Sequence, residues 1–318
     1  MRETTALMGK ACRADDRDQA ATLLKEGRLV AFPTETVYGF GADATNGLAV
    51  AAIFEAKRRP YFNPLISHLP EISRVDDFAL WNQKARDLAD AFWPGPLTLV
   101  LPRTPNCIIS DLVSAGLDTV ALRIPSDPQT LALLRATRLP VAAPSANLSG
   151  RVSPTMASHV EEELGSQVSM ILDGGACEIG LESTVLGFEN DDPVLMRPGG
   201  IPIEELELVV GRLRIKTTPA VLQSPGQLAS HYAPRKKLRL NAINCRTGEL
   251  LVGFGVIHDG SYNLSPNGDL REAAANLFSM LRQADHDTCV TIAVAPIPNK
   301  GLGRAINDRL QRAAAPRS

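Results

Sequence analysis

The chain has 318 residues, of which 44% are hydrophobic and 21% charged, and its formal net charge is −2. This length predicts two domains, or one large domain with an appendage, and the composition is typical of a soluble globular protein. The five cysteines are scattered, odd in number and without a C-x-x-C pair, which argues against a disulfide framework or a structural zinc site. No signal peptide or long apolar run is visible, so we expect a cytoplasmic protein without membrane association.

Charge is unevenly distributed along the chain. Residues 236–318 carry 11 Lys or Arg and 7 Asp or Glu, a balance of +4, so residues 1–235 carry 22 and 28, a balance of −6. An acidic main body is a poor electrostatic footprint for nucleic acid. The charge distribution therefore argues against an RNA-binding module, which remains an alternative function.

Helical and strand patterns alternate along the chain. A helix capped by Asp15 or Asp16 should reach Glu26 and end at Gly27. The further helices that we expect are 48–57, 83–92, 128–137, 155–164, 203–210, 270–282 and 303–313. The expected strands are 29–32, 64–69, 97–101, 119–124, 141–143, 170–172, 184–188, 250–254 and 290–295. Because turns join several strands, this α/β pattern favours a twisted mixed sheet with flanking helices.

The periodicity weakens between the two α/β units. From residue 211 to residue 235 the chain contains two Pro-rich turns, TTP at 217–219 and SPG at 224–226, which are typical of a linker. We therefore predict a main domain over 1–211, a linker over 212–235 and a small α/β domain over 236–318.

The first candidate site is the string FPTETVYGFG at residues 32–41. An apolar run ends there at a proline, and hydroxyl residues and a Gly-x-Gly turn follow. Such a break after a buried strand offers backbone N–H groups and short donors to a ligand. Together with the cations that follow, it predicts a site for a small polar ligand that carries phosphate.

Those cations lie at the end of a predicted helix. Lys57 and Arg59 could simply be solvated charges that favour a helix C-terminus. The rigid segment from Pro60 to Pro64 offers the other interpretation, because it would aim Lys57, Arg59 and Asn63 together at a triphosphate.

Two further polar residues lie in predicted strands. His68 is a lone strand histidine, which is usually structural, and no His or Cys lies at metal-ligand spacing from it. Arg123 lies in the apolar strand TVALRI and needs an anionic partner if it is buried. That partner is either a structural carboxylate or the carboxylate of a ligand in a cleft.

Several loops after strands are rich in small donors. PSANLSG (144–150) with SPT (153–155) precedes a helix, where N–H groups and hydroxyls can receive phosphate oxygens. ESTV (182–185) and MRPG (196–199) add hydroxyl and cationic residues. By contrast, Gly301-Leu302-Gly303 lacks the third glycine of a nucleotide fingerprint, and we interpret it as packing.

Together these strings resemble the YrdC-type threonylcarbamoyl-AMP synthases, in their long form with a C-terminal domain. The matching pieces, in family order, are FPTETVYG (32–39), AKRRP with NPL (56–65), WPGPLT (93–98), GLDTVALR (116–123), APSANLSG (143–150), SPT (153–155), ESTV (182–185) and RPG (197–199). HYAP at 231–234 resembles the family's linker. The resemblance implies a YrdC-like fold around a large concave cavity, followed by a small Rossmann-like domain.

The resemblance also implies a reaction. L-Threonine, bicarbonate and ATP would give threonylcarbamoyl-AMP, pyrophosphate and water, with Mg²⁺ accompanying ATP. The product would feed threonylcarbamoyladenosine formation in tRNAs that read codons starting with A, through a partner transferase and with at most a weak tRNA contact. A carbamoyl-transfer domain of the same fold is a second alternative, but the C-terminal unit offers no active-site motif for it.

Residue by residue, the resemblance assigns both substrates. The residues implied for threonine are Thr36, His68, Arg123, Ala143 and Ser183. Those implied for ATP are Arg59, Asn63, Thr119, Ser145, Ser153, Arg197 and Tyr232, the last one covering ATP from the linker. Lys57 and Arg59 are the expected catalytic cations, Arg58 is expected to point outward, and no side chain is assigned to a metal.

Overall fold

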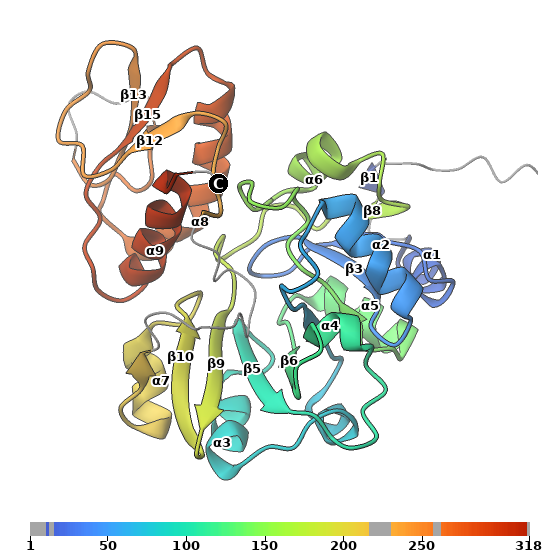
Figure 1. Cartoon of the computed structure of the whole chain (residues 1–318). Coiled ribbons are helices and arrows are strands. Elements are labelled where there is room, and N and C mark those ends of the chain that lie inside the picture. The colour runs from blue at the N-terminus through green and yellow to red at the C-terminus, as the bar shows by residue number, and fades with distance from the viewer. Residues whose placement is uncertain (1–10, 13–15, 216–229, 257–261, 317–318) are drawn as a thin grey trace, which may run out of the picture.

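The computed structural model describes residues 11–12, 16–215, 230–256 and 262–316. Its larger part is built on an 11-stranded mixed sheet with the order β1-β8-β2-β3-β7-β4-β6-β5-β9-β10-β11. The strands are β1 (Ala11–Cys12), β2 (Val30–Phe32), β3 (Gly39–Asp43), β4 (Ile66–His68), β5 (Leu97–Pro102), β6 (Thr119–Arg123), β7 (Val141–Ala142), β8 (Met170–Leu172), β9 (Thr184–Glu189), β10 (Asp192–Arg197) and β11 (Arg214–Ile215). The expected twisted mixed sheet is confirmed (Figure 1).

Helices pack around this sheet. They are α1 (Arg17–Lys25), α2 (Gly47–Lys57), α3 (Gln83–Phe92), α4 (Asp111–Ser114), α5 (Pro128–Thr137), α6 (Ala157–Leu164) and α7 (Ile203–Val210), with a 3₁₀ helix over Ile72–Asp77. Asn46 starts α2 by accepting hydrogen bonds from the backbone N–H groups of Leu48 and Ala49. The helix ends where Arg58 adopts a left-handed conformation, with φ at 50°.

The apparent Gly-x-Gly turn at residues 39–41 is a strand, which corrects the sequence interpretation. β3 runs antiparallel to β2 and places Gly41 opposite Val30. A Cβ on Gly41 would lie 2.5 Å from the Phe32 ring and 2.9 Å from Val141. Glycine therefore serves here to let an aromatic ring lie flat across the strand rather than to make a turn.

The smaller domain is a four-stranded parallel sheet with the order β12-β15-β13-β14. Its elements are β12 (Lys237–Arg239), β13 (Glu249–Gly253), β14 (Tyr262–Asn263), α8 (Leu270–His286), β15 (Thr291–Val294) and α9 (Gly303–Ala314). A parallel sheet with helices agrees with the expected small α/β unit. α8 continues to His286, past the predicted end at Arg282.

The boundary between the domains differs in detail from the prediction. The large sheet continues to Ile215, because β11 pairs with β10, so it extends beyond the predicted boundary at residue 211. Most of the predicted linker, residues 216–229, lies outside the described residues. No helix in the described part of the chain is long and apolar enough to span a bilayer.

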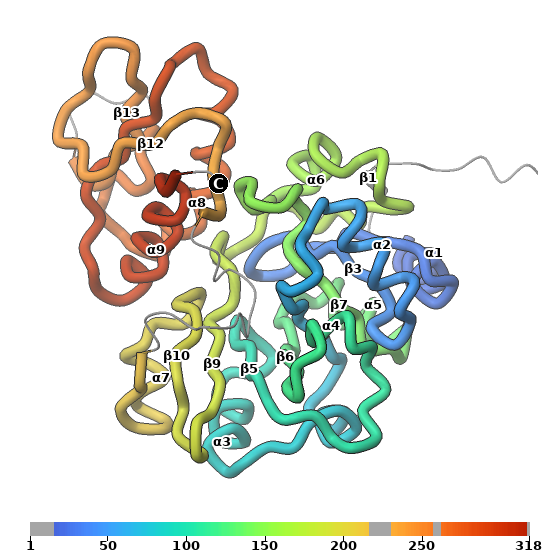
Figure 2. Tube along the Cα trace, viewed as in Figure 1, coloured from blue at the N-terminus to red at the C-terminus, as the bar shows by residue number. Residues whose placement is uncertain are grey.

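The two domains share a packed interface. Val37, Val152, Leu181 and Tyr232 belong to the same apolar cluster as the core of the small domain. Gly180 lies so close to α8 that a Cβ on it would be 2.6 Å from the backbone of Ala275. Figure 2 shows the segment before α6 running beside α8.

Candidate functional site

One edge of the large sheet gathers most of the predicted site residues. β4 and β6 are parallel and pair His68 with Arg123 at their carboxyl ends. β7 is antiparallel to β4 and begins at the same edge, where Val141 pairs with His68. The segment before β9 reaches this edge because β9 starts opposite Leu97 at the beginning of β5. The sheet thus brings together segments that are distant in sequence.

A cavity lies at this edge. Its walls are formed by Thr34, Thr36, Val37, Tyr38, Gly39, Arg59, Ile66, His68, Arg123, Ala143, Pro144, Ser145, Glu182, Ser183, Arg197, His231 and Tyr232. The space inside it that the centre of a water-sized sphere can occupy is about 40 Å³, room for about three water molecules. His231 and Tyr232 form part of its wall, and both come from outside the sheet.

Arg123 has a structural carboxylate as its partner and also lies at the cavity. It is 4% exposed and forms an ion pair with Glu35, with Nη2 2.7 Å from Oε1. Its Nη1 donates to Thr36 Oγ1 at 2.9 Å, and its Nε donates to the Gly95 carbonyl at 3.3 Å. The guanidinium is therefore held by a structural carboxylate while it also lines the cavity.

His68 is buried and neutral. Burial, and then the nearby Arg123, lower its pKa to about 3. The edge of its ring packs against Phe32, with ring centroids 6.1 Å apart, and its Nδ1 has no hydrogen-bond partner among the described residues. His68 therefore offers an uncharged polar atom beside Arg123.

Arg59 and Arg197 give the cavity a cationic wall. Arg59 donates to the carbonyls of Asn63 and Pro64 at 3.2 and 3.0 Å, and no carboxylate in the described residues pairs with it. Burial, and also the neighbouring Arg197, lower its pKa to about 9. Arg197 donates to the Ser183 carbonyl and hydroxyl at 2.9 and 3.1 Å. Two buried cations side by side favour an anionic ligand.

Lys57 is buried, but it does not line the cavity. Its ammonium donates to the Ser145 carbonyl at 2.6 Å and to the Asn147 carbonyl. Burial, followed by the charge of Arg59, lowers its pKa well below the ordinary value. The position of Lys57 therefore differs from the one expected for a catalytic cation. Its hydrogen bonds link the loop after β7 to the end of α2.

Three other residues expected at ATP also lie outside the cavity wall. Asn63 is fully buried and its side-chain atoms have no partner among the described residues. Ser153 is buried and donates to Glu182. Thr119 starts β6, at the end opposite Arg123, although alternation places both on the same face of the strand. A ligand would have to extend over Ala121 to reach Thr119.

Tyr232 closes the cavity from the linker. Its ring stacks on Phe278 of α8 with centroids 5.6 Å apart, and the guanidinium of Arg309 lies 5.0 Å from its centroid. Its φ of 61° is unusual for an aromatic residue, and its hydroxyl has no partner in the described structure. The segment is fixed by Ala233 N–H, which donates to the Gly150 carbonyl at 2.8 Å.

Sequence reasoning missed three residues at the site, although all of them lie inside the motifs. Glu35 holds Arg123. Glu182 lines the cavity, accepts from Ser153 Oγ at 2.6 Å and pairs with Arg309 at 2.8 Å. His231 also lines the cavity, and burial lowers its pKa to about 3. Their partners lie far away in sequence, so no local spacing could have indicated these roles.

The sequence matches two family models, one after the other along the chain. Residues 22–199 match the family model Sua5/YciO/YrdC, described as telomere recombination, and residues 201–315 match the C-terminal domain of threonylcarbamoyl-AMP synthase. The threonylcarbamoyl-AMP synthases of Pyrococcus abyssi and Bacillus subtilis are each 42% identical, over 93% and 94% of this chain and 93% of each relative.

A solved structure extends the match over both domains. The crystal structure of Pyrococcus abyssi Sua5 complexed with L-threonine is similar with a TM-score of 0.88 and 38% identity, and the match covers 96% of each chain. The chain therefore belongs to the Sua5/YciO/YrdC family, in the form that carries the C-terminal domain of the threonylcarbamoyl-AMP synthases.

Proposed function

We propose that this chain is a threonylcarbamoyl-AMP synthase, which converts L-threonine, bicarbonate and ATP into threonylcarbamoyl-AMP, pyrophosphate and water. The observation that carries the proposal is one cavity with two kinds of wall. One part of the wall consists of Arg123, hydroxyl groups and the neutral His68. The other part consists of the buried Arg59 and Arg197. The names of the curated relatives and the threonine-bound relative support the same reaction.

Threonine belongs beside Arg123 in this proposal. The guanidinium would receive the carboxylate, with Thr36 and Ser183 as neighbouring hydroxyls and Ala143 as part of the wall. His68 is neutral at physiological pH, so it does not add a second positive charge that would repel the threonine ammonium. Its free Nδ1 is an acceptor suited to a hydroxyl or amine proton.

ATP belongs beside Arg59 and Arg197. Phosphate oxygens would meet these guanidinium groups and the donors of Ser145, while Lys57 holds the loop that carries Ser145. The described residues contain no group of three or more His, Cys, Asp or Glu that could cage a metal. Mg²⁺ would therefore arrive with the phosphates, keep several waters and neutralise phosphate charge there.

Both substrates require the cavity to open. The centre of a water-sized sphere can occupy only about 40 Å³ of it, too little to admit a molecule as large as ATP. His231 and Tyr232 form a wall that comes from outside the sheet. We propose that this wall moves away to admit ATP and returns to exclude water during the reaction.

The chemistry needs alignment more than covalent help from the protein. Bicarbonate and the threonine amine form a carbamate with loss of water, and a carbamate oxygen then attacks the α-phosphorus of ATP. The bond from that phosphorus to the bridging oxygen breaks, and pyrophosphate leaves. Arginines that surround the developing negative charge stabilise this transfer, since they act in a site shielded from water.

The test is to incubate the protein with ATP, threonine and ¹⁴C-labelled bicarbonate. Label in an adenylate, with equimolar pyrophosphate and a requirement for threonine, is the expected result. ATP turnover without a labelled adenylate would reject the proposed reaction. The same incubation with Arg59→Ala checks that the product comes from this cavity.

The RNA-binding alternative has less support. Lys57, Arg59 and Arg197 are each less than 10% exposed, so these motif cations cannot contact an RNA backbone. We propose that the product passes to a transferase that modifies tRNA, with the protein itself making at most a weak tRNA contact.

A further inference from the structure

The C-terminal domain contributes a fully buried cation to the wall behind the cavity. Arg309 of α9 is 0% exposed, and its Nε donates to Glu182 Oε2 at 2.8 Å. Its Nη2 donates to the Pro198 carbonyl at 2.9 Å, next to Arg197. Asp308 completes its surroundings at 2.6 Å from Nη1. Arg309 thus contacts two segments of the main domain that carry cavity residues.

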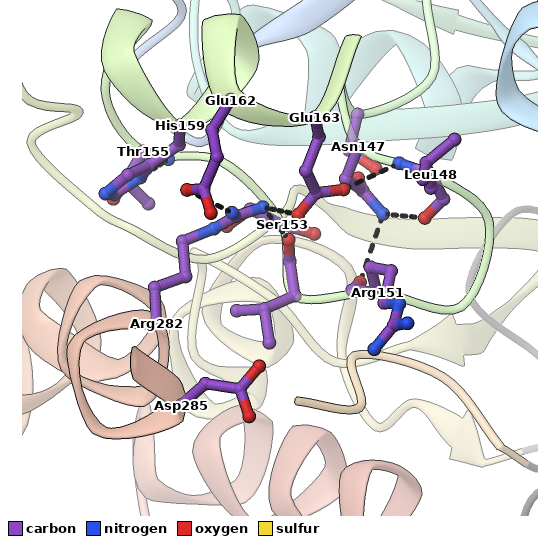
Figure 3. A network of polar contacts seen from close by, with 12 residues as sticks. Asn147, Leu148, Arg151, Ser153, Thr155, His159, Glu162, Glu163, Arg282 and Asp285 are labelled. Carbon is purple, nitrogen blue, oxygen red and sulfur yellow. Dashed lines mark hydrogen bonds and ion pairs between the residues drawn. The ribbon is translucent and has the colours of Figure 1, made fainter. Parts of the chain in front are cut away.

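A second arginine of the small domain holds the neighbouring loop (Figure 3). Arg282 of α8 forms an ion pair with Glu163 of α6, 2.6 Å from Nη2 to Oε1, and donates to the Val152 carbonyl. Its Nε lies 3.4 Å from the Ser153 carbonyl. Glu163 in turn accepts from the backbone N–H of Leu148 at 2.9 Å. One side chain therefore bridges α8, α6 and the loop before α6.

These two contacts converge on Ser153. Its carbonyl faces Arg282, and its hydroxyl donates to Glu182, which Arg309 fixes. We propose that Arg309 is a positioning residue for ATP, and that it acts with Arg282 to hold the Ser153 loop and Glu182 in the geometry that the nucleotide requires. This inference rests on the proposed function and assigns the C-terminal domain a part in building the ATP site.

Electrostatics gives Arg309 a second effect on the site. Glu182 is the only carboxylate among the described residues that line the cavity, and it faces Arg197 as well as Arg309. Burial raises its pKa, but Arg309 and then Arg197 outweigh burial, and the net pKa lies below the ordinary value. Without Arg309, Arg197 alone would compensate the negative charge of Glu182. Arg197 would then be less available to the phosphates, which need this cation.

The test compares substitutions at Arg309 by steady-state kinetics. Arg309→Met removes the charge and keeps much of the volume, and we expect the KM for ATP to rise by about tenfold or more while the KM for threonine changes less than about twofold. Arg309→Lys keeps a positive charge that can reach Glu182, but one ammonium cannot also donate to the Pro198 carbonyl. We therefore expect a KM for ATP between those of the wild type and Arg309→Met.

A matched control lies on the same helix. Arg304 also crosses the domain interface, to Glu204 at 3.0 Å, but this pair is partly exposed and remote from the cavity. Arg304→Ala should therefore leave both KM values unchanged. Equal changes in the two KM values for the Arg309 variants, or the same effect in Arg304→Ala, would show a general interface role and overturn the inference.

The design separates this inference from the function itself. If the wild-type chain forms no labelled adenylate, the proposed function fails. If the wild-type chain forms labelled adenylate but Arg309→Lys has a wild-type KM for ATP, only the inference about Arg309 fails. The Arg309→Lys variant tests this inference even if Arg309→Met does not fold. Arg282→Met gives a second reading, because it should also raise the KM for ATP selectively.

Discussion

At the scale of single residues, burial separates motif cations with different roles. Arg58 and Arg59 are neighbours, yet Arg58 is exposed as expected and Arg59 is buried in the cavity wall. The left-handed backbone at Arg58 turns the chain so that the two side chains diverge. This adjacent pair gives a direct test of which charge matters.

We predict that Arg59→Ala lowers kcat/KM for ATP by about 100-fold, because a charge-assisted contact to phosphate is lost in a site shielded from water. Arg197→Ala should have a similar effect. Arg58→Ala should behave like the wild type within about twofold. Pyrophosphate release measures all three, and circular dichroism confirms the fold. Normal activity in both cavity variants would remove ATP from this wall.

We also predict that the Tyr232 hydroxyl and ring have separable effects. Tyr232→Phe should keep stability within about 0.5 kcal/mol, because the hydroxyl has no protein partner, and should weaken ATP binding about fivefold. Tyr232→Ala should also lose about 3 kcal/mol of unfolding free energy, since the contacts with Phe278 and Arg309 disappear. Calorimetric titration with ATP and chemical unfolding measure the two effects. Equal ATP affinity in all three proteins would refute the role of the linker as a cover.

At the scale of elements, periodic segments were predictable and glycine-rich ones were not. The helices α2, α3, α5 and α7 lie where the apolar spacing placed them, within about a residue of their predicted ends. β3 was missed because Gly39 and Gly41 resemble a turn, whereas close neighbours across the sheet, chiefly the Phe32 ring, explain them. Glu182 was missed for a related reason, since its partner Arg309 is 127 positions away.

Another glycine sets the shape of the site at this scale. A Cβ on Gly199 would lie 2.3 Å from the Glu182 carbonyl oxygen and 2.4 Å from Thr184 N. We predict that Gly199→Ala displaces the segment before β9, lowers the unfolding free energy by about 2 kcal/mol and reduces activity. Thermal unfolding and pyrophosphate release check this prediction. Gly47→Ala is the control, because its Cβ would meet only Ser110 Oγ at 3.5 Å. Equal stability of the two variants would show that the close contact at Gly199 does not affect the unfolding free energy.

At the scale of the whole molecule, buried neutral histidines link stability to pH. Burial lowers the pKa of His68 and His231 to about 3 and that of His159 to about 4. His159 Nδ1 also accepts a hydrogen bond from the Thr155 N–H at 3.2 Å, which requires the unprotonated form. These residues lie in three different segments, so the effect concerns the whole fold.

The sign follows from which state binds more protons. Below about pH 6.5 the unfolded chain protonates these histidines while the folded chain does not, so we predict that the unfolding free energy falls as pH decreases from about 6.5 towards 4. Each histidine contributes up to about 1.4 kcal/mol per pH unit. Urea unfolding at several pH values measures the slope, and His159→Gln should reduce it. A flat profile down to pH 4.5 would contradict the assignment of neutral histidines.

The order of α9 and the large sheet along the chain has a consequence for synthesis. Arg309 is the partner of Glu182, and it follows Glu182 by 127 positions. A nascent chain still attached to the ribosome can form the large sheet, but it leaves the Glu182 carboxylate buried without its cation until α9 has emerged. Nonsense or frameshift changes that precede the codon of Arg309 should therefore be as damaging as those within the large domain.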